Sequence, residues 1–146
     1  MDTLGRYLDP AVFSVLGMMS FIALAAVIER CLHYRQLDPR CFENLESLRI
    51  DVNRGLTTIA TIAYNAPYVG LLGTVLGIML TFHEMSRSGV VETGAVMLRL
   101  SLALKATALG LMVAIPSMMA YNGLVARAET LLSSWQIAQQ SGRTRS

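Results

Sequence analysis

Ala66-Pro67-Tyr68-Val69-Gly70-Leu71-Leu72-Gly73-Thr74-Val75-Leu76-Gly77-Ile78-Met79-Leu80-Thr81-Phe82 is an uncharged, mainly apolar run near the middle of the chain. Between Gly55 and Phe82 the only ionisable side chains are the phenols of Tyr64 and Tyr68. A helix over these positions is about 40 Å long at a rise of about 1.5 Å per residue, and the hydrocarbon core of a bilayer is about 30 Å thick. The run therefore predicts a membrane-spanning helix, which we place at residues 58–82.

The composition of the 146-residue chain indicates a small integral membrane protein. Hydrophobic residues make up 53% and charged residues 15%, and the mean hydropathy is +0.49; soluble domains are usually less apolar and richer in charge. The formal net charge of +2 gives no reason to expect a nucleic-acid partner. The expected fold class is an all-α membrane protein with three transmembrane helices.

The first span is expected at residues 11–30, because the run Ala11–Ile28 carries no charge. Asp9-Pro10 has the form of a helix cap followed by a first-turn proline, so we expect the helix to begin there. A cleaved signal peptide is the alternative, since Ala23-Leu24-Ala25 resembles a cleavage site. The preceding residues are not a basic leader and the apolar run is long, so we favour a retained span.

The third span is expected at residues 97–121 and contains one charged residue in its interior, Lys105. Apolar residues keep helical spacing beyond Asn122, which predicts that this helix continues into water. The whole chain, residues 1–146, is then a single membrane domain whose segments outside the bilayer are mainly 31–57 and 122–146.

Residues 31–57 are more polar, and Asp38-Pro39 again has the form of a helix start. Apolar residues recur in this segment at helical spacing: Phe42, Leu45, Leu48, Val52 and Leu56. They predict a short amphipathic helix outside the bilayer. Cys31 and Cys41 lack a Cys-x-x-Cys spacing, so two reduced thiols are expected rather than a metal site, and no cofactor is expected.

Arginine is distributed unequally over the two sides of a three-span chain. One side holds Arg30, Arg35, Arg40, Arg49, Arg54, Arg127, Arg143 and Arg145. The other side holds Arg6 and Arg87, with Arg99 at a boundary. Because positive residues concentrate on the cytoplasmic side, the N-terminus is expected outside and the C-terminus in the cytoplasm.

Small residues form stripes in the second and third spans. Gly70, Gly73 and Gly77 recur at steps of three and four residues, which places them on one helix face. The second span's Thr74-Val75-Leu76-Gly77-Ile78-Met79 returns in the third as Thr107-Ala108-Leu109-Gly110-Leu111-Met112. We expect close helix packing and two threonines at similar depth, with Pro67 and Pro116 bending the second and third spans.

The blocks 66–79 and 106–122 together resemble the ExbB/TolQ/MotA family of proton-channel motor proteins, and the chain is most similar to its ExbB branch. The resemblance implies a multi-pass protein of the bacterial inner membrane that forms a homo-oligomeric ring, a pentamer in the family. It implies an ExbD-like single-span partner, a TonB-like protein and surrounding lipid as the other contacts. The implied function is coupling of the proton-motive force to TonB-dependent uptake across the outer membrane.

The same resemblance places Thr74 and Thr107 where family members have pore-facing polar side chains. A glutamate that some relatives carry early in the third span is replaced here by Leu102, and the segment between the first two spans is shorter than in many relatives. No Asp or Glu lies between Asp51 and Glu84, or between Glu92 and Glu129.

Because the second and third spans contain no carboxylate of their own, we expect a carboxylate of the ExbD-like partner to carry the proton, with Lys105 as its charge partner. The alternative is that Lys105 extends to the outer interface or meets Glu84 or Glu92.

The sequence leaves alternatives to this function. A flagellar-stator role is one within the same family, and the missing large cytoplasmic region argues against it. A TolQ-like role in envelope maintenance stays open, and so does a non-conducting membrane scaffold. An enzyme is not expected, since no ionisable groups converge inside the predicted spans.

Overall fold

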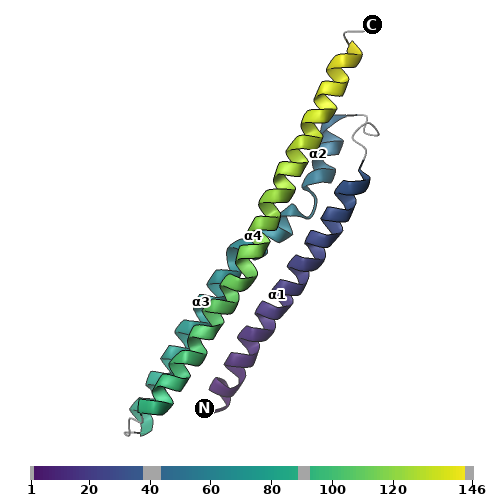
Figure 1. Cartoon of the computed structure of the whole chain (residues 1–146). Helices are drawn as coiled ribbons and strands as arrows, with labels where there is room; N and C mark the ends of the chain where they lie inside the picture. Colours follow the sequence, from purple (N-terminus) through teal and green to yellow (C-terminus); the bar gives the residue numbers. More distant parts are fainter. Residues whose placement is uncertain (1, 38–43, 89–92, 144–146) are drawn as a thin grey trace.

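The structure is a computed structural model that describes residues 2–37, 44–88 and 93–143, and all of its regular elements there are helices. In chain order these are α1 (Asp2–Gln36), α2 (Leu45–Asn53), α3 (Leu56–Ser88) and α4 (Thr93–Arg143). Helices α3 and α4 form a long antiparallel hairpin, and α1 runs along it (Figure 1). The short α2 lies beside α4, far from the α3–α4 turn (Figure 1).

Three helical segments are long and apolar enough to cross a membrane. They are Pro10–Gln36, Leu45–Arg87, which includes α2, and Thr93–Gln140. Large apolar side chains on their outer faces are exposed in the isolated chain, among them Phe21, Tyr68 and Met119. Such a surface suits lipid or neighbouring helices rather than water. The three-span fold class is therefore confirmed.

The start of α1 differs from the expected one. The helix begins at Asp2, and Pro10 lies inside it instead of opening its first turn. A proline removes only its own N–H bond to the carbonyl four residues back, so the helical segments on either side of it can remain continuous. The hydroxyl of Ser14 donates to the Pro10 carbonyl at 2.6 Å.

The amphipathic segment is divided between two helices. Leu48 and Val52 are buried on α2, as expected, whereas Leu56 begins α3 after a turn at Gly55. Helix α2 is capped by Asn44, whose side-chain oxygen accepts a hydrogen bond from the Ser47 N–H at 2.8 Å. The expected start at Asp38-Pro39, together with Phe42, falls outside the described residues.

The main hydrophobic core lies where all four helices meet, beside α2. Its buried members are Tyr34, Leu48, Val52, Leu56, Ile59, Leu124 and Ala128. Trp135 and Leu131, beyond the predicted third span, pack against this core. The extension of α4 past Asn122 is therefore confirmed, and packing against α2 explains why it stays attached to the molecule.

Candidate functional site

Helices α3 and α4 cross most closely at two glycines. A Cβ atom built on Gly70 would lie 2.7 Å from the carbonyl oxygen of Ala106, and one built on Gly110 would lie 2.7 Å from that of Ala66. Real Cβ atoms do not approach a carbonyl oxygen so closely. The two backbones therefore touch here, and only residues without a side chain permit this approach.

Thr74 and Thr107 lie directly beside this crossing. Their hydroxyl groups are hydrogen-bonded to each other across α3 and α4. The Thr74 hydroxyl is also 3.1 Å from the Ala103 carbonyl and 3.3 Å from the Gly70 carbonyl. The Thr107 hydroxyl is 3.3 Å from the Gly70 carbonyl. Equal depth in the two antiparallel helices is thus confirmed.

The threonine pair has more hydrogen-bond acceptors than donors. Each hydroxyl carries one proton, and the neighbouring acceptors are the other hydroxyl and the carbonyls of Gly70 and Ala103. If one hydroxyl donates to the other, the second donates to a carbonyl, and the two roles can be exchanged. A hydroxyl of this pair can therefore turn toward a new acceptor while its neighbour remains satisfied.

The pair is enclosed within the single chain. Thr74 is only 8% exposed and Thr107 is half-buried. Threonine hydroxyls in helices often donate to the carbonyl four residues back, which would be Gly70 for Thr74 and Ala103 for Thr107. Thr74 has this bond with Gly70, whereas Thr107 is bonded to Gly70 and Thr74. Their exposure to a pore stays a prediction about the assembled protein.

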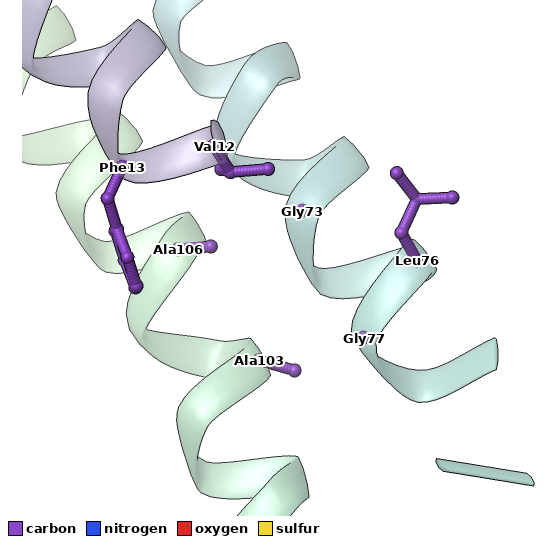
Figure 2. A pocket seen from close by; sticks show the side chains of 7 residues that line it. All are labelled: Val12, Phe13, Gly73, Leu76, Gly77, Ala103 and Ala106. Carbon is purple, nitrogen blue, oxygen red and sulfur yellow. The ribbon is translucent and has the colours of Figure 1, made fainter. Parts of the chain in front are cut away.

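A small pocket lies between the hairpin and α1. Its lining consists of Val12 and Phe13 from α1, Gly73, Leu76 and Gly77 from α3, and Ala103 and Ala106 from α4 (Figure 2). A Cβ on Gly73 would lie 2.8 Å from Cγ1 of Val12, and one on Gly77 would lie 2.8 Å from Cβ of Ala103. The glycine stripe of α3 thus packs against helices of its own chain.

Lys105 lies on α4 away from this packing. Its side chain is exposed, and no hydrogen bond or ion pair joins it to any part of the chain that the structure describes. The neighbouring turns of α4 carry exposed leucines, including Leu102 and Leu109. A single cation therefore interrupts an uncovered apolar helix face.

Glu84 does not serve as the counter-ion of Lys105. It forms an ion pair with Arg99 instead, which links the ends of α3 and α4 near their turn. Glu92, the other expected alternative, falls outside the described residues. Two of the charged groups near the turn thus neutralise each other, and Lys105 is left without a described counter-ion.

Both expected prolines lie inside helices. Pro67 is in α3 and Pro116 is in α4. Ser117, next to Pro116, donates to the Val113 carbonyl at 2.7 Å. Bending at the two prolines stays a prediction.

Three features of the site were not anticipated. They are the Ala103 carbonyl as an acceptor for Thr74, the contact of Val12 with Gly73, and the Glu84–Arg99 pair. The sequence did contain a signal for the ion pair. Glu84 lies near the end of α3 and Arg99 near the start of α4, and these helix ends lie next to each other in an antiparallel hairpin. The other two involve a backbone atom and a generic apolar residue, which carry no sequence signature.

Comparison with known proteins gives a consistent result. Residues 38–137 match the model of the MotA/TolQ/ExbB proton channel family. The chain is 48% identical over 137 residues to "Biopolymer transport protein ExbB" of Helicobacter pylori, covering 94% of each protein. It is 47% identical over 136 residues to the protein of the same name from Aquifex aeolicus, covering 93% of this chain and 92% of that one. It is 41% identical over 80 residues to "Tol-Pal system protein TolQ" of Pseudomonas aeruginosa, which is 55% of this chain and 35% of that protein.

Proposed function

The chain belongs to the MotA/TolQ/ExbB proton channel family, and on that premise we propose that it is an ExbB-type motor subunit that couples the proton-motive force to TonB-dependent uptake across the outer membrane. Several copies form a ring, a pentamer by family resemblance, around an ExbD-like single-span partner. The ring acts through a TonB-like protein. Its place is the inner membrane, as three apolar helices and the family indicate.

The observation that carries the proposal is the threonine pair. Thr74 and Thr107 bring two hydroxyls and two carbonyls together between apolar helix segments that otherwise offer few polar groups. A packing role alone is already fulfilled by Gly70 and Gly110 at the same crossing. In the assembled ring we expect one hydroxyl of each pair to turn toward a partner's proton-carrying group.

The proton carrier itself is proposed to be a carboxylate of the ExbD-like partner. A proton crossing 100 mV releases about 2.3 kcal/mol, and a protonatable group is needed to take it up. Lys105 is a cation with no described counter-ion on an apolar face of α4. Placed beside the partner's carboxylate, its ammonium group would favour the ionised form and thus proton release.

The orientation proposed for the chain follows the arginine distribution. The N-terminus is periplasmic, the spans are near 11–30, 58–82 and 97–121, and the C-terminus is cytoplasmic. The core around α2 and the extension of α4 then lie on the cytoplasmic side, mostly within segments 31–57 and 122–146, with Ile59 of the core at the start of the second span. The Glu84–Arg99 pair lies on the periplasmic side.

A TolQ-like envelope-maintenance role is the second candidate. The coverage of relatives favours the ExbB role, because the chain covers 94% and 92% of two ExbB proteins but 35% of the TolQ relative. A non-conducting scaffold would account for the glycine packing but gives no role to Lys105.

The proposal is tested by affinity purification of the tagged full-length chain from membranes, with identification of the single-span proteins that accompany it. An ExbD-like and a TonB-like protein are expected. Deletion of the gene should abolish energy-dependent uptake through outer-membrane receptors, and reintroduction should restore it. Recovery of single-span proteins of a Tol-Pal system alone, with uptake intact, would favour the TolQ role. Recovery of no single-span partner would support the scaffold.

A further inference from the structure

Three polar side chains near the end of α1 lie outside the site described above. Arg30, His33 and Tyr34 are spaced three and four residues apart, which places them on one face of the helix. All three contact α2 near its end: Arg30 Nη1 donates to the Asp51 carbonyl at 3.4 Å, and the Tyr34 hydroxyl donates to the Val52 carbonyl. His33 Nε2 lies 2.7 Å from Oδ2 of Asp51.

These contacts satisfy backbone groups that a helix cannot satisfy itself. The last carbonyls of a helix have no partner within it and form its negative end. At the end of α2 the Arg54 N–H donates to the carbonyls of Ile50 and Asp51, at 3.1 and 3.3 Å. The Tyr34 hydroxyl donates to the Val52 carbonyl. The guanidinium of Arg30, a residue that is 6% exposed, is a second donor to the Asp51 carbonyl. Side chains of α1 thus cap the end of α2.

The same arginine also lies against the residue that precedes α3. Gly55 has a φ of +80°, a conformation that other residues rarely adopt. A Cβ atom at this position would lie 2.7 Å from Nε of Arg30. The Arg30 side chain is therefore in contact with both the end of α2 and the turn from which α3 begins.

We propose that Arg30, His33 and Tyr34 form a clasp that joins α1 to the corner between α2 and α3, and that this clasp stabilises the last turn of α2 in addition to the packing of α2 against α4. Helix α2 has 9 residues, whereas isolated helices shorter than about 12–15 residues are marginal in water. The clasp thereby couples the position of α1 to the start of α3, so that the helices move as one unit. This inference does not depend on the proposed function.

Hydrogen exchange on the purified full-length protein tests the clasp. Tyr34→Phe removes one hydrogen bond to α2 and keeps the buried ring. Its matched control is Tyr121→Phe, because Tyr121 packs against the same core and its hydroxyl has no partner among the described residues. The amides of Asn53 and Arg54 should exchange about fivefold faster in Tyr34→Phe, as expected for the loss of ~1 kcal/mol, and at the original rate in the control.

A second pair of variants tests the arginine. Arg30→Met should accelerate exchange at the same amides, whereas Arg35→Met, which removes an exposed arginine of the same helix, should leave it unchanged. Should Arg30→Met unfold the protein, the comparison of Tyr34→Phe with Tyr121→Phe still tests the clasp. Equal exchange in Tyr34→Phe and Tyr121→Phe would overturn the clasp, and so would faster exchange spread evenly over all four helices.

Discussion

Gly70 and Gly110 face each other across the α3–α4 hairpin, and their Cα atoms form the contact between the two helices. A Cβ on Gly70 would lie 3.1 Å from the Cα of Gly110, and a Cβ on Gly110 would lie 3.0 Å from the Cα of Gly70. Because this approach depends on two residues from different helices, either substitution should separate the helices. The threonine hydroxyls one turn away would then lose contact.

Gly110→Ala should therefore destabilise the hairpin by about 1–3 kcal/mol, the usual range for overpacking. Gly123→Ala is the matched control on the same helix, since a Cβ there meets nothing within 4 Å. The control should be neutral, or stabilising by up to about 1 kcal/mol through helix propensity. Thermal unfolding in detergent measures both, and equal midpoints would contradict the close approach.

Gly73→Leu and Gly77→Leu should disturb assembly indirectly. Both glycines contact helices of their own chain, Gly73 against Val12 and Gly77 against Ala103, so a leucine displaces α1 or α4 within each subunit. We expect native mass measurements to show less of the ring and more of smaller species. An unchanged ring in both variants would show that the hairpin tolerates the larger side chain.

Thr74→Val and Thr107→Val keep the side-chain shape and remove the hydroxyl. If a hydroxyl of the pair serves proton transfer, energy-dependent uptake should fall about fivefold or more. The loss of ~1 kcal/mol of folding free energy that is expected for one hydrogen bond should leave the subunit folded. Ring assembly should remain, as checked by native mass. Thr130→Val is the control, because its hydroxyl donates to the Ala126 carbonyl on an exposed part of α4. Full uptake in both test variants would argue against the pore role.

Lys105→Met should impair uptake while leaving the ring assembled, and Lys105→Arg should keep part of the activity because it keeps the charge. Arg99→Met is the matched control. Arg99 is half-exposed in its pair with Glu84, and exposed ion pairs contribute about 0–1 kcal/mol. Normal uptake in Lys105→Met would mean that the lysine only extends to the interface.

Reporter fusions at Arg49 and Gly89 should report opposite sides of the membrane. The first position is expected in the cytoplasm and the second in the periplasm, because arginine concentrates in the segments that include Arg49. Labelling of both positions from the same side would contradict the three-span orientation.

The number and approximate place of the long helices followed from the sequence. Apolar length and the absence of charge from 58–82 are properties of a continuous segment, and they need no knowledge of its neighbours. The repeated Thr-x-x-Gly pattern likewise indicated two antiparallel helices with matched threonines. The Asp9-Pro10 pattern predicted the wrong start for α1, because a local cap signal does not show whether a helix already runs through it.

The partners of individual side chains depended on the folded arrangement. Thr74 meets Thr107 and Ala103, Glu84 pairs with Arg99 rather than Lys105, and Arg30 turns inward against Gly55. Each of these contacts joins different helices or the turn between them. Helical spacing fixes which residues share a face, but the rotation and register of one helix against the next come from packing, as at the crossing of Gly70 and Gly110.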